Sequence, residues 1–369
     1  MRRDLFLSLF PSPTYFAVSN VGLDISDQSV KFIELLPHNG RVTIGRFGEQ
    51  DIPAGVVEAG KIKKPEELEK ILVELKEKYK ISRAVVSLPE EQAYTIRVRL
   101  PFVNEDEIRD SLDLQLVELV PIPAASAVVD YDIYKRPVDE KGFYDLSVSV
   151  VPREMVESYA GVLTSSLFVP IALEIEAQAL ARAFIPKDSH EVVMIVDIGK
   201  TRTSISINVG QMVLYTSTVS NIGGDNITHS IEKNLHVTYE EAEKLKIEKG
   251  ILRSSDSQDL FYSLTPVIST LKDEIMKVVA YWRDHHSDGE IEMDKKIDRV
   301  VLCGGQASLP GLDQYISINL ELPTKVGNPW TNVLDFSDSV PVMDFRNSLR
   351  YSTAIGLALR TLMPLVFHD

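Results

Sequence analysis

The stretch that decides the fold is FAVSNVGLDISDQSVKFIEL at residues 16–35. An apolar run that ends in Asp24 is followed by a short polar turn and a second apolar run, which predicts a strand, a tight turn and a strand. A second copy, VVMIVDIGKTRTSISI at residues 192–207, repeats the pattern with Asp197 in the place of Asp24. Because the two hairpins lie about half the chain apart, they predict two similar α/β domains that face each other.

A third turn adds to these two hairpins. The sequence CGGQASLPGL at residues 303–312 follows the apolar stretch DRVVLC at 298–303 and precedes a predicted helix. Glycines at such a turn let the backbone approach a flat or anionic ligand, and an aspartate that ends a strand can lie near the metal that screens a phosphate. Neither G-x-x-x-x-G-K-S/T nor G-x-G-x-x-G occurs in the chain. The three turns therefore predict a nucleotide site that is neither a P-loop nor a Rossmann site.

Composition narrows the function classes. The 369 residues carry a net charge of −15, and an acidic chain repels phosphate backbones, so no nucleic acid partner is expected. The single cysteine, Cys303, excludes an intramolecular disulfide and fits a reducing compartment. The apolar runs are shorter than the ~18 residues of a membrane span. The start MRRDLFLSLF is a poor signal peptide, and two interpretations stay open, a frayed terminus or a short amphipathic segment on a membrane surface.

Apolar periodicity predicts the other elements. Helices are expected at 65–80, 104–120, 152–168, 171–184, 258–284 and 348–363, with two more within 225–250, and strands at 84–88 and 143–151. Asn104 and Glu107 form the pattern of a capping box at the start of the second of these helices.

Five segments resemble, in order, the signature of actin-like ATPases. They are VGLDIS (21–26), IEAQALA (175–181), VDIGKTRT (196–203), LCGGQASLPG (302–311) and AIGLA (354–358). Further segments resemble the PilM family of type IV pilus assembly proteins, which are relatives of FtsA: SVKFIEL (29–35), LPFVNEDEIR (100–109), VPIP (120–123), VVDYDIY (128–134), VSVVPREMV (148–156), NIGGDNIT (221–228) and EEAEKLKIEKG (240–250). Together these segments are spread from residue 21 to residue 358, along nearly the whole chain.

The resemblance implies an α/β, two-lobed actin-like (ribonuclease H-like) ATPase fold with an inserted SHS2-like subdomain in the first lobe. The expected divisions are a tail at 1–14, the first lobe at 15–95 and 166–190, the insert at 96–165, the second lobe at 191–345 with a helical subdomain at about 225–290, and a closing helix at 346–369.

The resemblance also implies the roles of individual residues toward ATP and Mg²⁺. Asp24 and Asp197 would hold the metal through water, and Glu176 would position attacking water. Two loops would contact the phosphates: the first loop with Ser26, Asp27, Gln28 and Ser29, and the second loop with Gly199, Thr201 and Thr203. The glycine pair Gly223 and Gly224 would lie near the phosphates. The helix pair Glu243 and Lys246 would contact the ribose and adenine, and Gly304 and Gly305 would form the purine turn.

The first loop departs from the family pattern of D-I-G-x-x-S. Here it reads DISDQS, so Ser26 has a less free backbone than glycine. Asp27 places a negative charge beside the expected phosphates, which weakens binding unless the carboxylate points away or meets metal. Lys200 in the second loop is the residue that could offset this charge.

The implied function is a cytoplasmic ATP-binding adaptor at the cytoplasmic face of the inner membrane. Its partner would be the N-terminal cytoplasmic peptide of the inner-membrane protein PilN, with the insert forming part of the groove. Other pilus motor and alignment proteins are further expected partners, membrane association would be peripheral and through partners, and self-association stays open. The alternative is a hydrolysing or polymerising FtsA-like ATPase, which the end of the chain soon after residue 360 disfavours. A sugar kinase would need a catalytic aspartate in a separate loop, and the sequence offers no convincing one.

Overall fold

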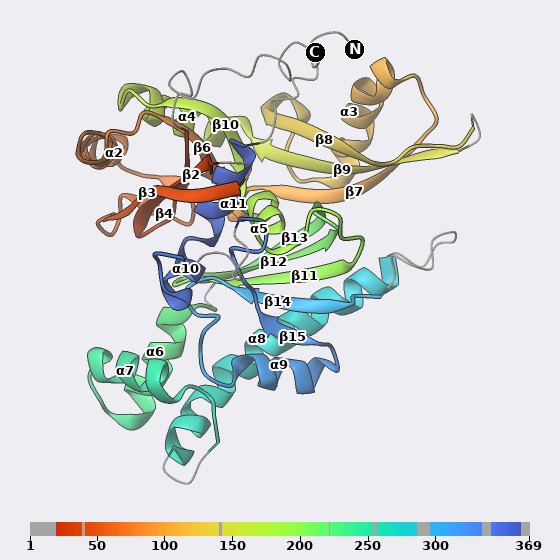
Figure 1. Cartoon of the computed structure of the whole chain (residues 1–369). Coiled ribbons are helices and arrows are strands. Elements are labelled where there is room, and N and C mark those ends of the chain that lie inside the picture. Colours follow the sequence, from red (N-terminus) through yellow and green to blue (C-terminus); the bar gives the residue numbers. More distant parts are fainter. Residues whose placement is uncertain are drawn as a thin grey trace.

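The computed structural model describes residues 20–38, 41–139, 142–220, 222–253, 257–285, 296–333 and 341–362. The expected tail at 1–14 and the part of the first predicted strand before Asn20 lie outside these residues. Two five-stranded sheets form the centre of the molecule (Figure 1). The first is ordered β10-β6-β1-β2-β3 and the second β13-β12-β11-β14-β15.

The strands of the first sheet are β1 (Val21–Ile25), β2 (Ser29–His38), β3 (Arg41–Asp51), β6 (Arg83–Leu88) and β10 (Val169–Ile175). Those of the second are β11 (Val192–Ile198), β12 (Arg202–Val209), β13 (Met212–Ser220), β14 (Arg299–Cys303) and β15 (Thr324–Val326). The small hairpin β4 (Val57–Glu58) and β5 (Lys61–Ile62) lies beside the first sheet.

The two sheets confirm the predicted duplication. β1 pairs antiparallel with β2 and parallel with β6, and β11 pairs antiparallel with β12 and parallel with β14. Asp24 lies opposite Lys31 in its hairpin, and Asp197 lies opposite Ser204. Each strand runs one residue further than predicted, because Ile25 and Ile198 still pair with the partner strand. The two aspartates therefore occupy equivalent positions in two copies of one unit.

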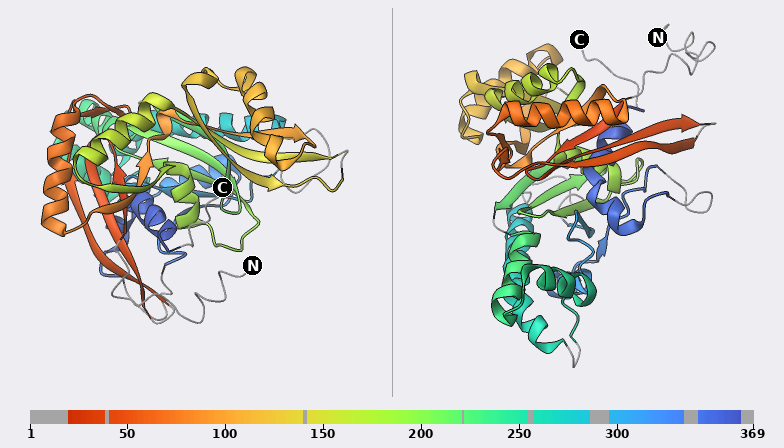
Figure 2. Two further views of the ribbon diagram at one scale, coloured as in Figure 1. Left: turned by 90° about the horizontal axis from the view of Figure 1, so that it is seen from above. Right: turned by 90° about the vertical axis from the view of Figure 1, so that its left-hand side faces the viewer.

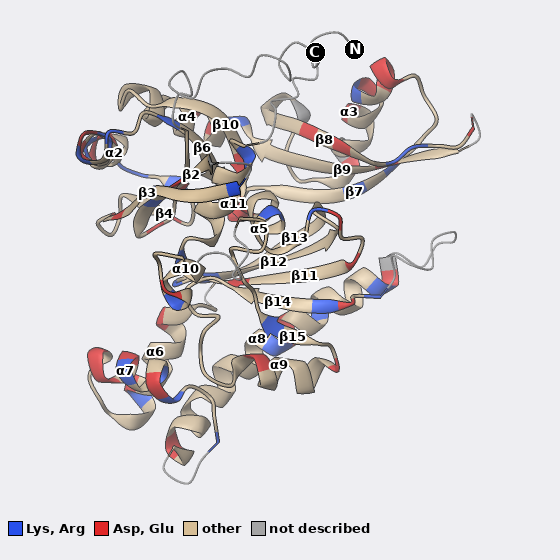
Figure 3. Cartoon of the chain, in the orientation of Figure 1, with Lys and Arg blue, Asp and Glu red and all other residues tan. Residues whose placement is uncertain are grey.

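Helices cover the outer face of the first sheet. They are α2 (Pro65–Tyr79) and α4 (Arg153–Ser165), and Figure 2 shows both on the side away from the second lobe. α2 buries Leu68, Leu72 and Leu75 at helical spacing, and Lys80 ends it in the left-handed conformation. Its remaining positions carry interspersed acidic and basic side chains (Figure 3), as on a solvated helix face.

A third sheet, ordered β7-β9-β8, lies beside the first. Its strands are β7 (Tyr94–Pro101), β8 (Ala127–Lys135) and β9 (Phe143–Pro152), and α3 (Ile108–Leu119) packs on it. The short 3-10 helices η2 (Glu90–Gln92), η3 (Glu105–Glu107) and η4 (Ala124–Ser126) connect these elements, and the Asn104–Glu107 capping box is present. The apolar core of this sheet and α3 is separate, whereas the buried side chains of α4 belong to the main core.

The second lobe carries α6 (Gly224–Leu235), α7 (Tyr239–Lys249), α8 (Gln258–His285) and α9 (Leu312–Leu320). α10 (Phe345–Arg350) and α11 (Ser352–Arg360) follow, and α11 returns to pack on β1 and β2 of the first sheet. The prediction of one helix over 348–363 is therefore wrong in detail, because the chain bends at Tyr351, the C-cap of α10.

The prediction of one helix over 171–184 is also wrong. The chain forms β10 up to Ile175, paired in parallel with β6, and α5 (Glu176–Phe184) begins at the next residue. The stretch IALEI is a short apolar run, which periodicity alone does not assign to strand or helix. Hydrogen bonds to the otherwise free edge of β6 stabilise these residues as a strand rather than as part of the helix.

α5 and α11 cross between the two sheets at very close range (Figure 1). A side chain at Gly356 would place its Cβ 1.9 Å from the carbonyl oxygen of Ala179. A Cβ at Gly22 of β1 would lie 2.0 Å from the carbonyl oxygen of Ala354. Small residues at these positions thus allow α5, α11 and β1 to pack backbone against backbone.

Among the described helices, none has the length and apolarity to span a membrane.

Candidate functional site

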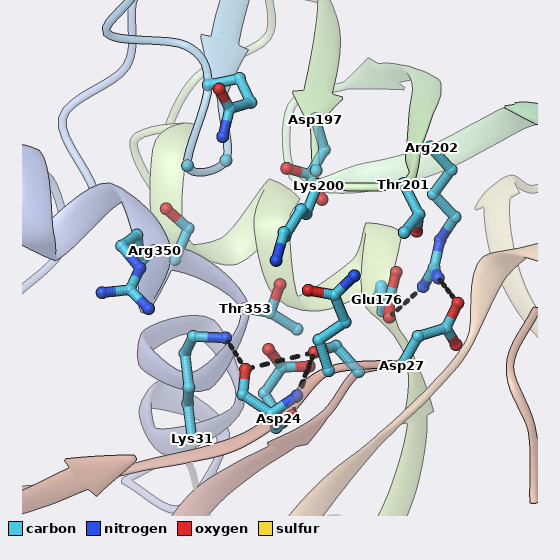
Figure 4. Close-up of a pocket in the computed structure, with 18 of the residues that line it drawn as sticks. Asp24, Asp27, Lys31, Glu176, Asp197, Lys200, Thr201, Arg202, Arg350 and Thr353 are labelled. Carbon is cyan, nitrogen blue, oxygen red and sulfur yellow. Dashed lines mark hydrogen bonds and ion pairs between the residues drawn. The ribbon is translucent and has the colours of Figure 1, made fainter. Parts of the chain in front are cut away.

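A cavity of about 270 Å³ lies between the ends of β1 and β11, where the two sheets face each other (Figure 4). Its lining joins the two hairpin loops, the glycine turn after β14 and the α10–α11 region. The lining residues are Asp24, Ser26, Asp27, Gln28, Ser29, Lys31, Glu49, Asp51, Glu176, Asp197, Gly199, Lys200, Thr201, Arg202, Ser204, Gly304, Gly305, Gln306, Leu349, Arg350, Ser352 and Thr353.

Asp24 is held at the floor of this cavity by the first sheet. Its Oδ1 accepts a hydrogen bond from Ser87 Oγ at 2.9 Å, and the same hydroxyl accepts from the Ile25 amide at 3.1 Å. Burial raises the pKa of Asp24, while Lys31 opposes this rise. The carboxylate is therefore fixed and poorly solvated, and a cation in the cavity would stabilise its charged form.

The β1–β2 loop is tight without glycine. The Ser26 amide and hydroxyl both donate to the Ser29 carbonyl at 3.0 Å. Asp27 lines the cavity, but its carboxylate is already engaged, since it accepts hydrogen bonds from the amides of Gly60 at 3.0 Å and Ala59 at 3.2 Å. The β4–β5 turn thus takes up the negative charge that was expected to weaken phosphate binding.

The second loop is built by backbone contacts with α6. The Gly199 carbonyl accepts from the Gly224 amide at 3.0 Å, and the Lys200 carbonyl accepts from the Asp225 amide at 2.9 Å. A Cβ at Gly223 would lie 2.6 Å from the Lys200 carbonyl oxygen, so this close approach needs glycine. Gly223 and Gly224 therefore support the loop from behind and do not line the cavity.

Asp197 lies against the glycine turn. Burial raises its pKa to about 6, and Arg202 opposes this rise. Gly304 has a φ of +84°, and a Cβ there would lie 2.2 Å from Asp197 Oδ1. The turn after β14 therefore needs glycine both for its backbone conformation and for the space beside the carboxylate.

Besides Arg202, three cations line the same space, namely Lys31, Lys200 and Arg350 (Figure 4). Lys31 Nζ lies 2.5 Å from Ser29 Oγ and 3.7 Å from Glu49 Oε1, and Arg350 pairs with the same Glu49 oxygen at 2.6 Å. Neither Lys31 nor Arg350 was predicted as a site residue from the sequence. The hairpin register with Asp24 could have indicated Lys31, whereas no local pattern marks Arg350.

Glu176 is the first residue of α5 and points to the cavity from the first lobe. Its Oε1 accepts from Arg202 at 3.2 Å. Burial raises the pKa of Glu176 well above its ordinary value, and Arg202 opposes this effect. The position assigned to a water-positioning residue is thus occupied by a carboxylate already bound to a guanidinium.

Thr203, Glu243 and Lys246 do not line the cavity. The Thr203 hydroxyl donates to the Ile222 carbonyl at 2.6 Å, and Lys246 Nζ lies 2.6 Å from Glu243 Oε2. Lys246 also donates to the Gly224 carbonyl at 3.3 Å, and burial lowers its pKa. Glu243 and Lys246 thus contact α6 at Gly224 and Thr228, and α6 in turn supports the second loop.

We expect Glu90→Gln to stabilise the protein at pH 8 but not at pH 5. Burial raises the pKa of Glu90 to about 7, against hydrogen bonds from Thr216 and the Ala177 amide. The protonated form stabilises the fold below the ordinary value of 4.5, and this contribution is lost as the pH rises through 7. The loss amounts to at most about 3 kcal/mol, which glutamine avoids. Urea unfolding at both pH values measures the difference.

Glu77→Gln on the exposed face of α2 is the matched control, and it should change the free energy of unfolding by less than about 0.5 kcal/mol at either pH. An equal gain for Glu90→Gln at pH 5 and pH 8 would contradict the assigned pKa.

The fold and the two facing hairpin loops assign the protein to a structural class. Two equivalent sheets with a cavity between their hairpin loops form the two-lobed actin-like fold. Solved structures with this fold include MreB5 of Spiroplasma citri bound to ADP, with a TM-score of 0.58 and 12% identity over 94% of this chain and 97% of that chain. A "PilM-PilN type IV pilus biogenesis complex" has a TM-score of 0.77 and 20% identity, over 94% of this chain and 99% of that chain.

The family follows from the sequence. The sequence-family model of the type IV pilus assembly protein PilM matches residues 22–362, and the chain belongs to this family. The cell division protein FtsA of Neisseria meningitidis serogroup B is 27% identical over 203 residues, which are 48% of this chain and 45% of that protein. The chain thus spans less than half the length of this curated relative.

Proposed function

We propose that this protein is a nucleotide-binding adaptor of the type IV pilus assembly machinery. The observation that carries the proposal is the match of residues 22–362 to the PilM family. The similarity to a PilM–PilN complex over 94% of the chain supports the N-terminal cytoplasmic peptide of PilN as the partner. Such a role places the protein in the cytoplasm, at the inner face of the membrane that holds PilN.

The proposed cofactor is ATP. The cavity between the lobes is lined by both hairpin loops and by the cations Lys31, Lys200 and Arg350, whose side chains can donate charge-assisted hydrogen bonds to a polyphosphate. The purine end would lie at Gly304 and Gly305, while Glu243 and Lys246, which do not line the cavity, would support the site through α6. The actin-like fold supports this proposal, since MreB5 of Spiroplasma citri has been solved with both ADP and AMPPNP.

The residues also fit Mg²⁺. Among the described residues, no group of three or more His, Cys, Asp or Glu side chains is arranged to hold a metal ion. Mg²⁺ commonly keeps several waters and binds one or two carboxylates together with substrate phosphates. The buried Asp24 and the half-buried Asp197 line one cavity, so they would hold the ion through water. The ion would supply screening of the phosphate charge.

The contacts of Glu176 favour an adaptor over an active ATPase. A general base must be free to accept a proton from the attacking water. Glu176 instead accepts from the Arg202 guanidinium at 3.2 Å. We therefore propose that the site retains nucleotide and hydrolyses it at most slowly.

Leu114→Glu should weaken binding of a PilN N-terminal peptide at least tenfold. Leu114 is 80% exposed on α3, in the subdomain proposed to form part of the peptide groove. Replacing this apolar side chain by a carboxylate reduces the apolar area that the peptide can bury and adds a desolvation cost. Fluorescence anisotropy with a labelled peptide measures the affinity.

The matched control is Ile318→Glu on α9, because Ile318 is 76% exposed and lies in the second lobe. This variant should bind within twofold of the wild type. Unchanged affinity in Leu114→Glu would move the groove away from α3, and no binding by the wild type would reject the PilN proposal.

A further inference from the structure

Arg202 is a buried cation at the boundary between the lobes. It begins β12 in the second sheet, and its side chain is 13% exposed. Its guanidinium pairs with three carboxylates, Glu91 at 2.5 Å, Glu176 at 3.2 Å and Asp27 at 3.6 Å. Figure 4 shows Arg202 reaching from the second lobe to Asp27 and Glu176. We refer to these four residues as the Arg202 cluster.

The three carboxylates come from three separate segments on the first-lobe side. Asp27 lies in the β1–β2 loop, Glu91 lies in η2 after β6, and Glu176 follows β10 at the start of α5. Each side chain is partly or fully withdrawn from water, with exposures of 16%, 10% and 7% respectively. One guanidinium therefore connects the second loop to three fixed points across the cavity.

In the Arg202 cluster, one cation from the second lobe faces three carboxylates from the first lobe. Burial lowers the pKa of Arg202, but the negative charges of Glu176, Glu91 and Asp27 raise it by more. The pKa of Arg202 therefore lies above its ordinary value. If the lobes separate, three buried carboxylates lose their common partner and repel one another. Separation is therefore opposed both by the breaking of ion pairs and by uncompensated negative charge.

We infer that Arg202 is an interlobe clamp that controls how fast a nucleotide leaves the cavity. The inference rests on the proposed nucleotide binding, since the cavity lies between the loops that Arg202 connects. A ligand enclosed by two lobes leaves when they open, and contacts that bridge the lobes set the rate of opening. Arg202 acts through its carboxylate partners and is a positioning residue.

The test is release of a fluorescent ATP analogue, chased with excess unlabelled ATP in a stopped-flow instrument. Arg202→Gln should speed release at least tenfold, while the association rate stays within threefold. Arg202→Lys keeps a cation but loses the planar fork, so its release rate should lie between those of the wild type and Arg202→Gln. Glu91→Gln removes one bridge and should speed release severalfold.

Glu91→Gln also separates the clamp from a direct phosphate ligand. If Arg202 bound the phosphates itself, loss of Glu91 would free the guanidinium, and release would be unchanged or slower. That result overturns the inference. Since Glu91→Gln and Arg202→Lys both keep a cation in the cluster, they carry the test even if Arg202→Gln fails to fold.

Arg97→Gln is the matched control for loss of a buried arginine. Arg97 is 16% exposed and pairs with Asp145 at 3.1 Å, with both residues in the three-stranded sheet. Its release rate should match that of the wild type even if its melting temperature falls. If the wild type binds the analogue and Arg202→Gln releases it at the same rate, the clamp is rejected. If the wild type does not bind the analogue, the proposed nucleotide site fails, and the clamp fails with it.

Discussion

Replacing Gly356 by alanine should lower the free energy of unfolding by about 3 kcal/mol or more. The added Cβ would lie 1.9 Å from the Ala179 carbonyl oxygen and 2.9 Å from its Cα. These are backbone atoms of α5, so no side-chain rotation relieves the overlap, and α5 and α11 must move apart. Because α11 also packs on β1 and β2, this movement disturbs the first sheet as well.

Gly161→Ala is the matched control, since it makes the same chemical change inside a helix. A Cβ at Gly161 of α4 meets nothing within 4 Å. Alanine has the higher helix propensity, so this variant should be more stable by up to about 1 kcal/mol. Thermal and urea unfolding of both variants give the comparison. Equal stability of Gly356→Ala and the wild type would show that α5 and α11 do not cross at this close range.

The duplication was predictable because its signal is local and repeated. Asp24 and Asp197 each end an apolar run before a polar turn, and this pattern requires no knowledge of tertiary contacts. The equivalent sheet orders confirm the interpretation. The alanine-rich stretch before Phe184 was harder, because its first residues form a strand only where β6 offers a free edge.

The charged groups of the cavity were the less predictable part. Arg350 reaches Glu49 across 301 positions of sequence, and no local pattern connects them. The partners of Arg202 were equally unpredictable from the sequence, since they lie far from it along the chain. The sequence indicated that Asp27 was unusual, but only the fold shows that the amides of the β4–β5 turn bind its carboxylate.

Asp24→Asn and Asp197→Asn should each weaken binding of Mg–ATP at least tenfold. Under the proposed function, both carboxylates hold waters of the metal, and an amide lacks the charge that makes this interaction strong. Asparagine keeps the size of the side chain, and at Asp24 it keeps an acceptor for the Ser87 hydroxyl. Titration calorimetry with ATP and excess Mg²⁺ measures the loss.

The same two variants should behave in the opposite way without the metal. In EDTA, each of the two aspartates places a negative charge beside the phosphates, so its removal should leave ATP affinity unchanged or raise it. Asp298→Asn is the control, because Asp298 accepts from the Val192 amide at the start of β11, away from the cavity. A metal role predicts a loss that depends on Mg²⁺, whereas general damage to the site predicts an equal loss in both conditions. An equal loss, or no loss with Mg²⁺, would therefore remove this pair of aspartates from the metal site.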